Sequence, residues 1–75
     1  MKGYGVVLFY ATSSALRAEK TLAKAGLAAK LIPTPRELSS DCGVALRFDG
    51  NQAERVRGLL ESAHVEVAGI HSMPS

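Results

Sequence analysis

The side chain best suited to chemistry in this sequence is the thiol of Cys42, the only cysteine among 75 residues. A thiol attacks and carries other groups as its thiolate. Because it stands alone, it cannot form a disulfide within the chain or a metal site built on several thiolates. The sequence has no Cys-x-x-Cys pair and no glycine-rich phosphate loop. We therefore expect no metal and no cofactor.

The residues before Cys42 form the one long polar connection of the chain. Pro33 and Pro35 cannot donate to a sheet, so the segment from Pro33 to Cys42 is predicted to be a loop. The polar run Ser39-Ser40-Asp41 favours exposure of Cys42, and Ser39 could bind an anion or satisfy the loop backbone. A buried, inert cysteine that opens a strand is the other interpretation, because cysteine is among the most buried residue types.

The remaining sequence alternates between strand-like and helix-like patterns. Apolar and β-branched runs predict four strands, and a period of 3.6 residues predicts two helices. The expected strands are Tyr4–Tyr10, Leu27–Ile32, Gly43–Phe48 and Val65–Ile70. The expected helices are Ser14–Ala25, capped by Thr12 or Ser13 and stopped by Gly26, and Gln52–Ala63. His71–Ser75 is expected to be a frayed tail, with residues 72–75 disordered.

The order β-α-β-β-α-β predicts one α+β domain over residues 1–75, a ferredoxin-like two-layer sandwich. Its sheet should be antiparallel in the order 4-1-3-2, with both helices on one face. Val6 and Leu8 should then pack under the helices, and Val7 and Phe9 should lie on the open face, unless the register is swapped. An uncovered apolar patch at Val7 and Phe9 would indicate a homodimer or a partner surface.

This topology places Cys42 at a particular end of the sheet. The third strand begins where the first strand ends, and Thr12 and Ser13 open the first helix at that point. A helix N-terminus offers unpaired N–H groups and a partial positive charge, and both favour a thiolate. Arg36 could add positive charge, and Gly43 would leave room for a partner's backbone.

Composition narrows the remaining function classes. The net charge is only +2, and the predicted third strand carries a single aromatic, Phe48, so we expect no nucleic-acid partner. No stretch approaches the ~18 apolar residues of a membrane span, so we expect no membrane insertion. A lone thiol suits a reducing compartment, which indicates the cytoplasm. His64 is interpreted as a surface histidine, and His71, in the expected tail, as incidental.

The segment Leu31–Phe48 carries the pattern Pro-x-Pro-Arg-x-Leu-Ser-x-x-Cys-Gly, and Phe9–Leu16 precedes a helix. In these features the chain resembles the putative selenium/sulfur carrier protein-like family, from about Tyr4 to Val67. The resemblance implies that Cys42 holds sulfur or selenium, as a persulfide or selenosulfide, for transfer between donor and acceptor proteins. It implies a carrier or accessory protein rather than a stand-alone enzyme. Shaping of the Cys42 loop would fall to four residues: Pro35, Arg36, Ser39 and Gly43.

A second hypothesis remains open. The chain could be a non-catalytic binding or regulatory module that dimerises through the open face of its sheet, with Cys42 structural. The solvent accessibility of Cys42 and its rate of alkylation discriminate between the two.

Overall fold

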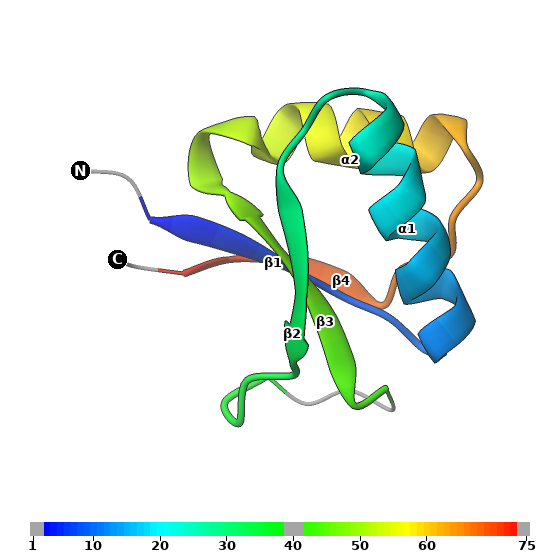
Figure 1. Ribbon diagram of the computed structural model, residues 1–75. Coiled ribbons are helices and arrows are strands. Elements are labelled where there is room, and N and C mark those ends of the chain that lie inside the picture. Colours follow the sequence, from blue (N-terminus) through cyan, green and yellow to red (C-terminus); the bar gives the residue numbers. More distant parts are fainter. Residues whose placement is uncertain (1–2, 39–41, 74–75) are drawn as a thin grey trace.

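The computed structural model describes residues 3–38 and 42–73 and shows one four-stranded antiparallel sheet with two helices packed on one face (Figure 1). The strands are β1 (Tyr4–Leu8), β2 (Ala29–Pro33), β3 (Val44–Asp49) and β4 (Gly69–Met73). The helices are α1 (Thr12–Lys24) and α2 (Ala53–Ser62), with a short 3₁₀ turn, η1 (Gly50–Gln52), before α2. Neither helix in this described part is long and apolar enough to span a membrane.

The strand order across the sheet is β2-β3-β1-β4, and every neighbouring pair is antiparallel. The central pair sets the register: Leu8 lies opposite Ala45 at one end, and Tyr4 lies opposite Asp49 at the other. The predicted α+β class, with four strands and two helices, is confirmed.

The first assignment of the two faces of β1 was wrong, and the swapped register that the sequence left open is the one adopted. Val7 and Phe9 lie under the helices in the main core, whereas Val6 and Leu8 lie on the open face. Both pairs are apolar, so hydrophobicity alone could not choose between them. The choice follows from the neighbouring strands, because residues directly opposite in an antiparallel sheet share a face. Polar Arg47 shares the open face with Val6, its partner across the pair.

The apolar residues at the centre of the open face are almost completely covered. Val6 and Ala45 are fully buried and Leu8 is 4% exposed. Four partly buried side chains pack against this small cluster: Tyr4, Ile32, Leu38 and Met73. The prediction of a dimer or partner interface at Val7 and Phe9 was therefore wrong, because both residues are fully buried.

The last strand lies further along the chain than the sequence predicts. The apolar residues Val65 and Val67 suggested a strand over Val65–Ile70, but they contribute to the core from a connection that precedes β4. Pairing with β1 decides the strand instead, with His71 opposite Val6 and Met73 opposite Tyr4. The prediction of a frayed tail from His71 was therefore wrong for residues 71–73, which belong to β4. Residues 74–75 lie outside the described part.

Both helices end in the same way. After α1, Gly26 adopts a left-handed backbone (φ 80°), and the Leu27 N–H donates to the Leu22 carbonyl at 3.0 Å. This is the predicted glycine stop. After α2, His64 takes the left-handed position (φ 58°), and the Val65 N–H donates to the Leu60 carbonyl at 3.0 Å. His64 is thus an exposed helix stop as well as a surface histidine.

Replacing His64 with glycine should stabilise the fold. A left-handed backbone costs a non-glycine residue about 1 kcal/mol, and glycine avoids this penalty. For a domain of this size, a gain of about 1 kcal/mol raises the melting temperature by about 4–8 °C. Thermal unfolding followed by circular dichroism measures the change. Gly26→Ala is the matched variant and should lower the melting temperature; a decrease for His64→Gly would contradict the interpretation.

Candidate functional site

Cys42 lies at the meeting point of the sheet and the first helix. It comes two residues before β3, and its Sγ is 3.8 Å from the Oγ1 of Thr12, the first residue of α1. The antiparallel pairing of β1 and β3 brings them together, because the start of β3 lies beside the end of β1. The juxtaposition predicted from topology is present.

The start of α1 differs from the expected cap. The N-cap is Ala11, which makes no side-chain capping bond, and its carbonyl accepts from the N–H groups of Ser14 and Ala15 at 3.1 and 3.4 Å. The prediction that Thr12 or Ser13 would be the N-cap was therefore wrong. The Thr12 hydroxyl contacts the cysteine sulfur instead, and Ser13 is exposed on the first turn.

The thiol is almost completely covered. Cys42 is 3% exposed and belongs to the core cluster that lies between the sheet and the helices. The expectation that its side chain would be at least partly reachable by solvent was therefore wrong, and the alternative of a buried cysteine describes its placement. A polar stretch before a strand predicts that the main chain approaches the surface, but it does not fix the direction of one side chain.

The backbone at Cys42 is hydrogen-bonded to Thr34, the residue that follows β2. The Thr34 hydroxyl donates to the Cys42 carbonyl at 2.8 Å, and the Thr34 N–H donates to the Gly43 carbonyl at 3.0 Å. These two bonds join the two ends of the loop between β2 and β3, and we call this pair of bonds the neck of the loop. Sequence reasoning missed Thr34, although a hydroxyl residue between two prolines at a strand end is a recognisable signal for such a bond.

The other predicted site residues are spread over this loop. Pro35 is half-buried, and its carbonyl accepts the Leu38 N–H at 3.0 Å in a tight turn. Arg36 is exposed on that turn. Gly43 is exposed, and a Cβ at this position would meet nothing within 4 Å, so the space that the sequence predicted beside it is open. Ser39 lies outside the described residues.

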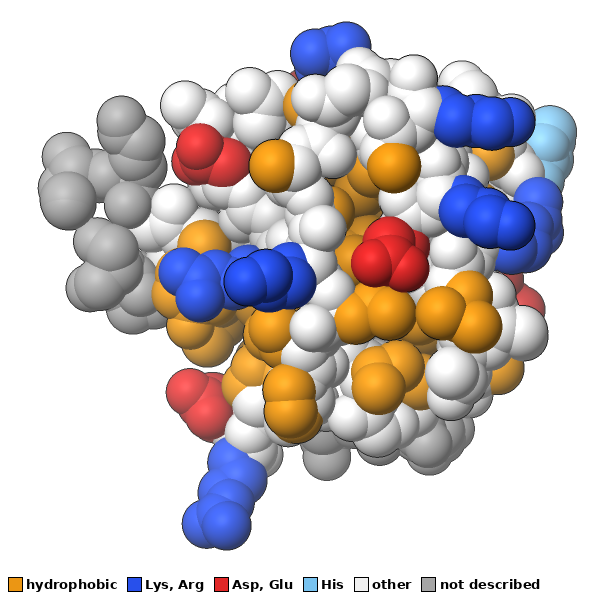
Figure 2. Space-filling model, viewed as in Figure 1, with side chains coloured by type: hydrophobic (Ala, Val, Ile, Leu, Met, Phe, Trp, Pro, Cys, Tyr) orange, Lys and Arg blue, Asp and Glu red, His pale blue; other side chains and the backbone are white. Residues whose placement is uncertain are grey.

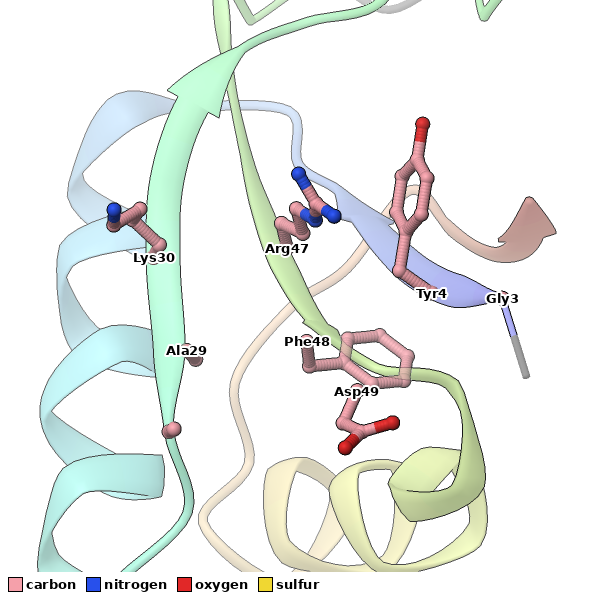
Figure 3. Close-up of a pocket in the computed structure, with 8 residues that line it drawn as sticks. Gly3, Tyr4, Ala29, Lys30, Arg47, Phe48 and Asp49 are labelled. Carbon is pink, nitrogen blue, oxygen red and sulfur yellow. The ribbon is translucent and has the colours of Figure 1, made fainter. Parts of the chain in front are cut away.

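A hollow lies at the end of β3 that is far from Cys42, and sequence reasoning missed it. Its volume is about 430 Å³, and its lining includes Tyr4, Lys30, Arg47 and Asp49. Figure 3 shows these side chains, with the Arg47 guanidinium beside the Tyr4 ring. The guanidinium carbon is 4.1 Å from the ring centroid, a cation–π contact. The signal was period-2 alternation, which puts Arg47 and Asp49 on one face of β3.

The distribution of charged side chains on the visible face does not mark either the Cys42 region or the hollow as a binding site. Figure 2 shows basic side chains distributed around the visible face rather than gathered into one broad patch. Among residues 3–38 and 42–73, no three His, Cys, Asp or Glu side chains are grouped as a metal ion would require.

Comparison with known proteins identifies the family. The model of the family described as "Putative Se/S carrier protein-like" matches residues 4–72. No curated protein and no solved structure matches the chain. The family match covers β1 to β3, both helices, the Cys42 loop and β4 as far as Ser72. The chain therefore belongs to the Putative Se/S carrier protein-like family.

Proposed function

We propose that this protein carries sulfur or selenium on Cys42 as a persulfide or selenosulfide and passes it to an acceptor protein. The observation that carries the proposal is the contact between the Cys42 sulfur and Thr12, at the start of α1, in a chain of this family. Hydroxyl and backbone N–H donors at a helix start can hold negative charge on sulfur. The protein would act as a carrier between a donor and an acceptor rather than as a complete enzyme.

The loading step is a transfer between thiols. The Cys42 thiolate attacks the outer sulfur of a donor persulfide, R–S–SH, so that a new S–S bond forms on Cys42 and the donor's S–S bond breaks. The donor leaves as the thiolate R–S⁻, and the proton stays on the transferred sulfur. No external oxidant or reductant is needed, because the oxidation state moves with the sulfur atom. Unloading is the same exchange with an acceptor thiolate, and selenium can replace the transferred sulfur.

The transfer requires a partner to reach the Cys42 sulfur, and the observed structure leaves this sulfur almost completely covered. An in-line attack needs room beside the sulfur, and Cys42 is 3% exposed. The two Thr34 bonds hold its backbone in place, and the space beside Gly43 is open on the outer side. We infer that local release of this neck presents the thiol to a partner. The direct test is intact-mass spectrometry after incubation with a cysteine desulfurase and cysteine, with one added sulfur atom as the expected result.

Thr34→Val should speed the reaction of Cys42 with small reagents. The substitution keeps the shape of the side chain but removes its hydrogen bond to the Cys42 carbonyl. A hydrogen bond of this kind contributes about 1 kcal/mol, so the open form should become about fivefold more populated. The rate of iodoacetamide alkylation under native conditions should rise by the same factor.

Thr21→Val is the matched control. Its hydroxyl also donates to a backbone carbonyl, that of Arg17 within α1, at 2.8 Å. It should leave the alkylation rate of Cys42 unchanged. Equal rates for Thr34→Val and the unmodified protein would show that the neck does not control access.

Burial of Cys42 is the observation that favours the alternative, a binding module in which the cysteine is structural. Under that alternative, alkylation would require global unfolding, and its rate would follow the unfolding equilibrium in denaturant. The carrier proposal instead expects alkylation at a rate that is insensitive to low denaturant, because only the neck must open.

Two further features fit the carrier proposal. We assign the two-layer arrangement to the ferredoxin-like class with sheet order 4-1-3-2, an assignment supported by the observed order β2-β3-β1-β4. We also place the protein in the cytoplasm, because a thiol that must stay reduced between transfers suits a reducing compartment.

A further inference from the structure

The two edges of the sheet differ in how they are protected from pairing with another chain. Among the described residues, β2 and β4 each pair with one neighbour only, so each edge presents a row of backbone N–H and C=O groups. The β2 edge carries two devices that discourage such pairing, the exposed Lys30 and the proline Pro33. The strand β4 (Gly69–Met73) contains no proline and no Lys, Arg, Asp or Glu, and the nearest proline in the sequence, Pro74, follows it. The β4 edge is therefore suited to accept a further strand.

An apolar groove lies beside this edge, between α2 and β4, with a volume of about 230 Å³. Its apolar lining comes from Leu60 of α2, from Val65 and Val67 in the connection, and from Ile70 of β4. Ile70 lies opposite Val7, so it is on the face that the helices cover, yet Val67 and Ile70 are only half-buried. A strand that paired with β4 would bring its own side chains over this groove, as in other cases of strand addition.

The charged residues at the groove indicate which strand fits there. Arg57 and Glu61 complete its lining, and both are exposed. They are four residues apart on α2, so they lie on the same face of the helix with opposite charges. A two-fold axis perpendicular to the sheet would pair β4 with the β4 of a second copy and make the two α2 helices antiparallel. Arg57 of each copy would then face Glu61 of the other, which is the self-complementarity that a two-fold interface requires.

The dimensions of the sheet permit this contact between helices. The helix α1 contacts β2 and β3, whereas α2 borders the groove beside β4, and Figure 1 shows both helices on one face. Joining two sheets through β4 would separate the two α2 helices by about two strand spacings, roughly 10 Å. Packed helices lie about 8–10 Å apart, so side chains of the two α2 helices would meet above the joined strands.

We propose that two copies of this chain associate through β4, so that their four-stranded sheets form one continuous eight-stranded antiparallel sheet. Backbone hydrogen bonds between the two β4 strands join the copies, and Ile70 and its neighbours bury the two grooves. The paired charges of Arg57 and Glu61 set the orientation. The interface is an edge of the sheet rather than its open face, and it does not involve Cys42. It stands independently of the carrier function.

Sedimentation equilibrium of the full chain measures this association. The mass should be twice that of one chain at millimolar concentration and should fall on dilution. Ile70→Asp should weaken association about 100-fold, because the interface contains the residue twice and each lost contact costs about tenfold. Ile32→Asp is the matched control, since Ile32 is a half-buried isoleucine on the other edge strand and packs on the open face. It should leave the dissociation constant unchanged, and circular dichroism shows whether each variant is folded.

Charge reversal on α2 tests the orientation with substitutions at exposed positions only. Arg57→Glu and Glu61→Arg each bring like charges together across the axis, and each should weaken self-association about tenfold. A mixture of these two variants should form a heterodimer about as tight as the dimer of the unmodified protein, because opposite charges meet again. A charge effect confined to one helix would not be rescued by mixing. Arg55→Glu, on the same helix but away from the groove, should leave association unchanged.

Three results would overturn the proposal. The first is a monomer at millimolar concentration, and the second is equal loss of association in Ile32→Asp or Arg55→Glu. The third is a mixture of the Arg57→Glu and Glu61→Arg variants that shows no preference for the heterodimer. A monomer whose β4 amides shift when an extended apolar peptide is added would assign the edge to a strand of another protein, and it would equally exclude the second copy.

Discussion

Cys42→Ser should abolish the uptake of sulfur completely, with no mass increase after incubation with a cysteine desulfurase and cysteine. The substitution replaces the only thiol of the chain with a hydroxyl of nearly the same shape. A hydroxyl is not ionised at neutral pH and cannot form a stable bond to sulfane sulfur. The effect on transfer should therefore be total rather than a graded loss.

The fold should survive this change with a modest loss of stability. Serine introduces a polar group at a site that is 3% exposed, and an unsatisfied buried hydroxyl costs about 1–3 kcal/mol. The Thr12 hydroxyl, 3.8 Å from the sulfur, is close enough to move into hydrogen-bond range and offset part of this cost. Circular dichroism and thermal unfolding check that the variant is folded before its mass is measured.

Two further measurements make the outcome decisive. Cys42→Ala removes the polar group altogether and should also take up no sulfur, so a folding defect in one variant does not end the test. If the unmodified protein gains no sulfur while its thiol reacts with iodoacetamide, the carrier function is wrong and not merely blocked by burial.

Gly5→Ala should be strongly destabilising for a change of a single methyl group. Gly5 lies on β1 directly opposite Phe48 on β3, and the Phe48 ring occupies the space where a Cβ on Gly5 would be. Adding the methyl forces the ring out of its position in the core, and overpacking of this kind costs typically about 1–3 kcal/mol. In a chain of this length, that loss should lower the melting temperature by about 4–8 °C for each kcal/mol.

Gly58→Ala is a matched control with the opposite expected sign. Gly58 lies within α2 and is exposed, and a Cβ there would meet nothing within 4 Å. Alanine is favoured over glycine in a helix by about 1 kcal/mol, so this variant should unfold at a higher temperature.

A double variant tests the cause. Adding Phe48→Leu to Gly5→Ala removes the ring that the methyl meets, so the two changes together should cost less than the sum of their separate effects. Additive losses would show that the Phe48 ring is not the group that Gly5 accommodates. The contrast also explains why β1 contains a glycine, a residue that normally weakens a strand.

The sequence by itself determined the class and the order of elements. Alternation of period 2 and period 3.6 is set by which residues are apolar, and it identified each strand and helix to within a few residues except at the C-terminal end. Gly26 was predictable as a helix stop because a left-handed backbone favours glycine on steric grounds alone. The Cys42 segment and its family were also readable, since they depend only on residue identity and spacing.

Only the tertiary structure decided how the candidate site is arranged. The two faces of β1 are both apolar, so the side that the helices cover depends on pairing with β3, a contact between residues about 40 positions apart. The burial of Cys42, its contact with Thr12 and the bond from Thr34 depend on the direction of individual side chains after the chain has folded.

The hollow at Tyr4, Lys30 and Arg47 required three strands to meet. Each of these residues is ordinary in its own segment, and none belongs to a local motif. Local periodicity fixes which face of a strand a side chain occupies, but only long-range pairing fixes its neighbours on that face. Local sequence patterns therefore determine the helices and strands of this protein. The Cys42 region and the hollow arise instead from contacts between segments that are distant in the sequence.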